Sequence, residues 1–240
     1  MSVAMTGVDR IADAFASHGK RAALMPYLMG GYPSLDASAE AGLAAAAAGA
    51  DLMELGMPFS DPLADGPVIH AAATEALAAG ATPHGVLRVC ERVSAQLPVV
   101  LMVYVNVVLT AGPEAFALRA ACDAEGLALV PLVAPTTTPE RIASIGADAR
   151  GFVYTVSLTG TTGERNELPA GLRETVERVR VSTDVPVAVG FGISTADQAS
   201  AVADIADGVI VGSRVVRAAG EGGHSAVGSV VAELAGAMKS

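Results

Sequence analysis

Hydrophobic residues along the chain fall into seven short, nearly continuous runs, separated by segments with helical periodicity. Strands of a parallel sheet are buried on both faces, so their sequences are apolar throughout rather than alternating. The runs therefore predict a parallel sheet, and the segments between them predict helices that cover it. The predicted strands are Ala22–Met29, Ala50–Met57, Pro98–Val105, Leu127–Ala134, Gly151–Ser157, Val185–Phe191 and Asp207–Gly212.

The predicted helices carry start signals and apolar faces. Thr82-Pro83 and Thr138-Pro139 each place a proline at the first helical position, where its missing N–H costs nothing. Thr195 and Gln198 have the spacing of a capping box. The last helix carries an apolar stripe at helical spacing, formed by Val227, Val231, Leu234 and Met238.

Regular alternation of strand and helix over 240 residues predicts a TIM-type (β/α)₈ barrel, which typically has about 250 residues. We expect a single domain spanning residues 1–240. The alternative is an open, doubly wound sheet, but its GxGxxG fingerprint is absent, and Gly30-Gly31 does not match it. Only seven strands are evident, one fewer than a complete barrel requires.

The segment Glu54–Pro67 has the strongest chemical signal. Glu54 ends an apolar run, and a carboxylate at the carboxyl end of a barrel strand is typical of a catalytic residue. Partial burial would raise its pKa and allow acid catalysis near neutral pH. Asp65 could accept a hydrogen bond from a substrate N–H. For Asp61 we expect either a structural role in the turn between them or a partner-facing role. The simpler alternatives are a charge at a strand end for Glu54 and an acid near a helix start for Asp65.

Two glycine loops follow the last two predicted strands, Gly190–Ser194 and Val211–Arg214. Glycines let backbone N–H groups approach an anion closely, and a following helix adds its positive end. Barrel enzymes commonly bind phosphate with their two final loops, so Gly192, Gly212 and Ser213 are candidate phosphate contacts. Two ordinary turns would also explain the glycines.

Composition excludes several classes of function. The net charge of −10 disfavours nucleic acid as a partner. Hydrophobic content is 52%, yet no apolar run reaches the roughly 18 residues that a membrane span needs. Cys90 and Cys122 belong to no metal-binding or redox motif, so we expect reduced thiols and no metal. The N-terminus has no signal-peptide pattern, and we expect a cytoplasmic protein.

The chain resembles the tryptophan synthase α subunit family. The resemblance rests on Glu54–Pro67, Val133–Thr137, Gly151–Tyr154 and the two glycine loops, and Val107 stands where the family usually has proline. It implies retro-aldol cleavage of indole-3-glycerol phosphate to indole and glyceraldehyde 3-phosphate, without a cofactor. It also implies an αββα assembly with a β subunit, which holds pyridoxal phosphate.

The resemblance assigns roles to residues of this sequence. Glu54 would be the acid–base catalyst, and Asp65 would bind the indole N–H. The Gly- and Thr-rich loop that begins at Tyr154 would close over the site, with Thr162 ordering it and Gly163 approaching the phosphate. The implied substrate contacts are Tyr27, Tyr104, Tyr154, Thr162, Gly163, Phe191, Gly192, Gly212 and Ser213.

One strand–helix unit of the family is missing around residues 117–118. We expect a barrel-like arrangement that is less stable than full-length relatives, with weak or absent activity without a β subunit. Two other functions fit the same residues: a different phosphate-binding barrel enzyme, such as an isomerase, and a non-catalytic homologue that only binds and regulates a β subunit.

Overall fold

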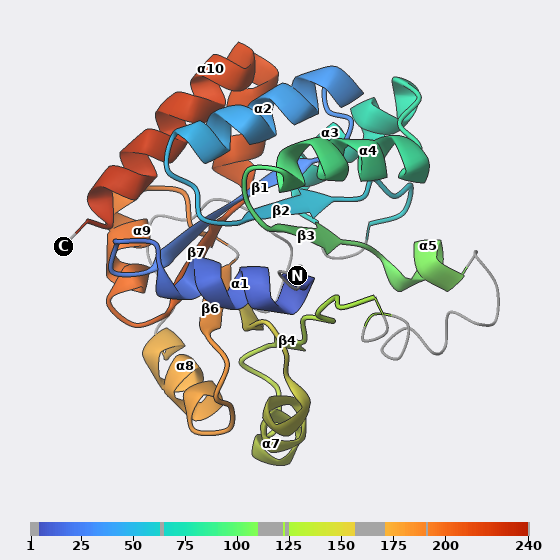
Figure 1. Ribbon diagram of the computed structural model, residues 1–240. Coiled ribbons are helices and arrows are strands. Elements are labelled where there is room, and N and C mark those ends of the chain that lie inside the picture. The colour runs from blue at the N-terminus through green and yellow to red at the C-terminus, as the bar shows by residue number, and fades with distance from the viewer. Residues whose placement is uncertain are drawn as a thin grey trace.

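The computed structural model describes residues 5–62, 65–109, 122, 125–156, 171–190 and 192–239. Seven parallel strands form one curled sheet in the order β3-β2-β1-β7-β6-β5-β4 (Figure 1). All seven predicted strands are therefore confirmed, each within the range predicted for it. The strands are β1 (Ala23–Met29), β2 (Met53–Gly56), β3 (Val99–Met102), β4 (Leu132–Val133), β5 (Val153–Val156), β6 (Val187–Gly190) and β7 (Gly208–Val211).

Helices cover the outer face of the sheet (Figure 1). The predicted caps are present: Thr82 accepts a hydrogen bond from the Gly85 N–H at 3.1 Å, and Thr195 forms a capping box with Gln198. The last helix is interrupted at Gly223, where φ is 59°. The described helices are α1 (Gly7–Ala16), α2 (Leu35–Ala47), α3 (Pro67–Ala78), α4 (Pro83–Ser94), α5 (Val105–Leu109), α7 (Pro139–Asp148), α8 (Leu172–Arg180), α9 (Ala196–Ala203) and α10 (Ser213–Ala237).

The core has an outer and an inner part. The outer part lies between strands and helices, and the predicted stripe of α10 is completely buried there, as at Val227 and Met238. The inner part is enclosed by the curl of the sheet, and α1 contributes Ile11 and Phe15 to it. The Phe15 ring packs on Phe152 with centroids 5.5 Å apart. Because Phe152 immediately precedes β5, α1 covers the amino-terminal end of the sheet. The carboxyl-terminal end, where the candidate site residues lie, is not covered by α1.

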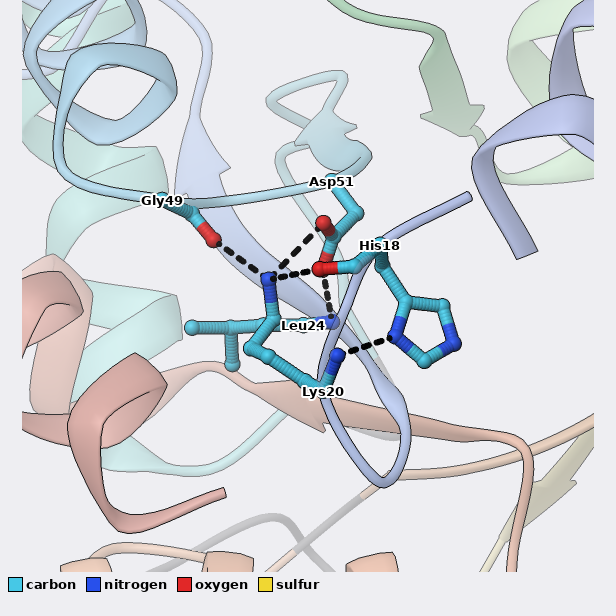
Figure 2. A network of polar contacts seen from close by, with 5 residues as sticks. All are labelled: His18, Lys20, Leu24, Gly49 and Asp51. Carbon is cyan, nitrogen blue, oxygen red and sulfur yellow. Dashed lines mark hydrogen bonds and ion pairs between the residues drawn. The ribbon is translucent and has the colours of Figure 1, made fainter. Parts of the chain in front are cut away.

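An ion pair fixes the starts of β1 and β2 relative to each other (Figure 2). Lys20 Nζ lies 2.8 Å from Asp51 Oδ1 and donates a further hydrogen bond to the Gly49 carbonyl at 3.1 Å. The second oxygen of Asp51 accepts from the Leu24 N–H at 2.7 Å. The two side chains are only 8% and 12% exposed, so water screens this pair weakly. The network therefore supports the register that places Tyr27 beside Glu54.

The sheet ends at β3 and β4, which are not paired with each other in the described part of the chain. A complete barrel has eight strands, and here the curled sheet is open at the position of the fourth. Both end strands are more exposed than the others: Val99–Met102 are only half-buried, and the Leu132 side chain is 47% exposed. The predicted strand Leu127–Ala134 shrinks to β4 because only β5 pairs with it. The expected barrel-like curl is confirmed, with an open gap rather than direct pairing.

Candidate active site

Glu54 lies inside the carboxyl end of the curled sheet. It is the second residue of β2, its side chain is 3% exposed, and its neighbours Met53 and Leu55 are fully buried. Burial raises the pKa of Glu54 from 4.5 to about 8, although the hydrogen bond with the Tyr154 hydroxyl lowers it. The nearby Asp65 contributes a smaller increase. Glu54 therefore holds a proton at neutral pH and can act as a general acid.

Asp65 is half-buried at the entrance to α3, close enough to Glu54 for their charges to interact. Burial raises the pKa of Asp65, while the hydrogen bond from the Tyr104 hydroxyl and the nearby His70 oppose this rise. The Tyr104 ring stacks on Phe59 with centroids 5.0 Å apart, which holds its hydroxyl in place. Asp65 thus presents an oriented carboxylate that can accept a hydrogen bond from a ligand.

Two tyrosine hydroxyls reach the site because two glycines leave room for them. A Cβ on Gly56 would lie 2.0 Å from the Tyr27 hydroxyl oxygen, and a Cβ on Gly190 would lie 2.3 Å from that of Tyr154. Each tyrosine therefore leans over a glycine of a neighbouring strand, toward the carboxyl end of the sheet. Glycine is required at both positions by this close approach.

The two glycine loops lie where the sequence predicts them, after β6 and β7. Gly192 has φ 81°, a left-handed conformation that favours glycine. Gly212 caps α10, and Ser213 is the first residue of that helix, so the positive end of the helix begins here. A Cβ on Gly212 would approach Tyr27 only to 3.8 Å, so the loop borders open space next to the tyrosine. An anion bound at this helix end would be adjacent to the carboxylates.

Arg214 connects the two glycine loops. Its guanidinium donates to the Ser194 carbonyl at 3.2 Å and pairs with Glu233 at 2.5 Å. Arg214 therefore ties the loop after β6 to both parts of α10, which holds the two glycine loops together.

The structure brings together five of the predicted side chains and both described glycine loops. Glu54, Asp65, Tyr27, Tyr104 and Tyr154 interact electrostatically or by hydrogen bonds, and Gly212 borders Tyr27. Gly192 follows β6 and Ser213 begins α10 directly after β7. The predicted contacts Thr162, Gly163 and Phe191, and the predicted lid itself, lie outside the described residues.

The sequence missed the polar roles of two tyrosines and one histidine. Tyr104 and Tyr154 were expected only as substrate contacts on the family resemblance, whereas in the structure the Tyr104 hydroxyl hydrogen-bonds with Asp65 and that of Tyr154 with Glu54. His70 lies on the first turns of α3, which brings it near Asp65. The spacing of five residues between Asp65 and His70, across a helix start, was the signal available for this pair.

The described residues offer no place for a metal and no helix that could cross a membrane. Among them, no group of three His, Cys, Asp or Glu side chains is arranged to hold a metal ion. None of the described helices combines the length and apolar character of a membrane span.

A curled parallel sheet with a buried, protonated carboxyl and two glycine loops at its carboxyl end is typical of an enzyme of the barrel class. The family profile of the tryptophan synthase alpha chain matches residues 14–121 and 114–239. The chain belongs to the tryptophan synthase alpha chain family, whose members are lyases of tryptophan biosynthesis that cleave indole-3-glycerol phosphate.

Individual relatives carry the same family name. The tryptophan synthase alpha chain of Synechococcus sp. (strain CC9902) is 47% identical over 239 residues, covering 89% of this chain and 88% of the relative. That of Gloeobacter violaceus is 45% identical, covering 87% and 86%. A structure of Mycobacterium tuberculosis tryptophan synthase superimposes with a TM-score of 0.88 at 35% identity, covering 99% of this chain and all of the other.

The alignment with the Synechococcus relative also indicates how many residues the missing strand–helix unit contained. The 239 aligned positions of the Synechococcus relative correspond to 89% of a 240-residue chain, or about 214 residues. About 25 aligned positions therefore have no residue in this chain. One strand–helix unit of a barrel of about 250 residues takes about 30. The deficit fits the loss of one unit, in agreement with the gap between β3 and β4.

Proposed function

We propose that this chain cleaves indole-3-glycerol phosphate with Glu54 as the acid–base catalyst. The observation that supports this most strongly is the state of Glu54: it is buried on β2, with a pKa of about 8 and a hydrogen bond from Tyr154. A buried carboxyl that is protonated at neutral pH can deliver a proton in a water-poor site.

In the proposed reaction, the bond between the indole ring carbon and the adjacent hydroxyl-bearing carbon breaks. Glu54 gives its proton to that ring carbon, and the resulting carboxylate takes the proton of the hydroxyl. The electron pair of the O–H bond forms the aldehyde C=O, and the pair of the broken C–C bond neutralises the protonated ring. Glu54 ends protonated, and the products are indole and glyceraldehyde 3-phosphate.

Asp65 is proposed to bind the indole N–H and to stabilise the positive charge of the protonated ring. Its hydrogen bond from Tyr104, and the stacking of Tyr104 on Phe59, would fix the direction of the carboxylate. A negative charge that is already oriented when the ring is protonated needs no reorganisation during the reaction.

The phosphate is proposed to bind at Gly192, Gly212 and Ser213, where two loops and the start of α10 meet. Binding energy from this remote group would hold the scissile bond at Glu54. Tyr27, Tyr104 and Tyr154 would line the indole and glycerol part of the site. Thr162, Gly163 and Phe191, which lie outside the described residues, are assigned to the substrate on the family resemblance alone.

The family also suggests a partner and a location. We propose an αββα assembly with a tryptophan synthase β subunit, in the cytoplasm, with pyridoxal phosphate confined to the β subunit. Cleavage by this chain would need no cofactor, because Glu54 supplies both proton transfers.

The test is Glu54→Gln, which keeps the shape of the side chain but removes the transferable proton. We expect indole release to fall about 10²-fold or more, with substrate affinity largely retained. The matched control is Glu177→Gln, an exposed position of α8. Both variants should be assayed with and without a β subunit. Near-normal indole release by Glu54→Gln would refute the assignment.

A further inference from the structure

Tyr27 lies at the meeting point of the three parts of the site. It is directly opposite Glu54 in the pairing of β1 with β2, and its side chain is 8% exposed. Its ring leans along the strand so that the hydroxyl stands over Gly56, where a Cβ would come within 2.0 Å. The base of the same side chain borders Gly212 of the phosphate loop, where a Cβ would lie 3.8 Å away.

The Tyr27 hydroxyl has no strong hydrogen-bond acceptor among the described residues. Its one hydrogen bond there is to the Met29 sulfur at 4.0 Å, and a thioether is a weak acceptor. Burial, followed by the nearby negative charges of Glu54 and Asp65, raises the pKa of Tyr27 well above its ordinary value. The hydroxyl therefore keeps its proton at neutral pH, and that proton is available to a ligand.

Resting on the proposed function, we infer that the Tyr27 hydroxyl donates a hydrogen bond to the glycerol oxygen next to the scissile bond. Glu54 acts at the scissile bond, Asp65 holds the indole nitrogen, and the Gly212 loop holds the phosphate. The substrate atom that lies between these three groups is the hydroxyl-bearing carbon with its oxygen. Tyr27 lies opposite Glu54 on the sheet, near Asp65, and borders Gly212.

The hydrogen bond would matter most as the C–C bond breaks. The oxygen gains negative charge when its proton moves to Glu54, before the aldehyde is complete. A neutral donor fixed in a buried site stabilises such charge without having to reorient. Tyr27 keeps its own proton throughout, so the proton balance of the reaction is unchanged.

The test is Tyr27→Phe, which retains the ring and its packing. We expect kcat to fall by about 10²-fold or more, with KM nearly unchanged, because removing one such donor from other enzymes costs about that much. The affinity for indole-3-propanol phosphate, an analogue without the glycerol hydroxyls, should equal that of the wild type. The matched control is Tyr32→Phe, which removes a hydroxyl that packs against Gly220 instead.

The outcomes separate this inference from the proposed function. A wild type that releases no indole, even with a β subunit, would refute both. With an active wild type, a Tyr27→Phe variant with unchanged kcat would overturn the inference alone. The inference would also be overturned if Tyr27→Phe lost affinity for indole-3-propanol phosphate by the same factor as it lost kcat. The tyrosine would then serve only to pack the site.

Discussion

At the scale of single residues, the most consequential feature is a carboxyl group that is buried with no cation beside it among the described residues. Glu54 lies among apolar neighbours, and its polar contact is the neutral hydroxyl of Tyr154. Burying a charged carboxylate there would be costly, so the folded protein retains the proton instead. The same burial that suits Glu54 for acid catalysis therefore makes the folded state sensitive to alkaline pH.

This sensitivity gives a prediction for stability. The folded pKa of about 8 exceeds the ordinary value of 4.5, so between these values the folded state binds more protons than the unfolded state. The contribution of Glu54 to stability is therefore complete below about pH 4.5 and is lost as pH rises toward 8, by up to about 1.4 kcal/mol per pH unit. Glu54→Gln should gain stability relative to wild type across this window.

Urea unfolding of both proteins between pH 5 and 9 measures this difference. The free energy of unfolding of Glu54→Gln relative to wild type should increase steadily up to about pH 8 and then level off. The unfolding free energy of Glu177→Gln should follow that of wild type throughout. Parallel curves for Glu54→Gln and wild type would show that Glu54 titrates near its ordinary pKa in the folded protein.

The sequence predicted the two carboxylates but not the tyrosine hydroxyls that surround them. Glu54 and Asp65 lie eleven positions apart in one recognisable segment, so a local pattern reveals them. Tyr154 is a hundred positions from Glu54, and Tyr27 lies on the strand before it. Their hydroxyls reach the site only through strand order and through the space left at Gly56 and Gly190. These are properties of the folded sheet, and no local pattern records them.

At the scale of elements, the start of α10 is the clearest binding feature. Gly212 has φ −101° and ψ −84°, outside the left-handed region, and a Cβ there meets protein atoms only at 3.8 Å or more. A larger side chain should therefore fit the fold but occupy the space in front of the helix. Its effect on binding can be separated from an effect on folding.

We predict that Gly212→Val loses affinity for inorganic phosphate and glyceraldehyde 3-phosphate by about 10-fold or more, because backbone N–H groups can no longer approach the anion. Calorimetric titration measures both affinities. Gly236→Val is the control, since that position lies in the last turn of α10 with no atom within 4 Å of a Cβ. Equal phosphate binding by Gly212→Val and wild type would place the anion elsewhere.

The elements themselves were largely predictable, since apolar runs and Thr-Pro caps mark strands and helix starts directly. The exception is the strand predicted at Leu127–Ala134, of which only Leu132–Val133 is paired. Its sequence is as apolar as that of the other strands. A strand needs neighbours as well as composition, and β4 has β5 on one side only.

At the scale of the whole molecule, the described sheet differs from a complete eight-stranded barrel in being open between β3 and β4. A closed barrel has no sheet edges, whereas β3 and β4 present theirs in the described structure. Large apolar side chains lie exposed near these edges, among them Val105, Leu127, Leu129 and Leu132. Unpaired apolar edges lower stability and promote association between chains.

Restoring the missing unit should therefore stabilise the protein. We predict that inserting the roughly 25-residue segment of the Synechococcus relative between Ala117 and Leu118 raises the melting temperature by at least about 5 °C. For a chain of this size, that shift corresponds to about 2 kcal/mol. An inserted strand, parallel to both neighbours, would pair with β3 and β4 and cover the apolar side chains at their edges. Light scattering should show less aggregation on heating.

A glycine–serine insertion of equal length at the same point is the control, because it extends the chain without supplying a strand. It should leave the melting temperature unchanged or lower it, since a longer flexible loop costs entropy to close. The family insertion should also raise indole release without a β subunit, by completing the wall of the site between β3 and β4. If the two insertions gave the same melting temperature, the gap in the sheet would not be what limits the stability of this chain.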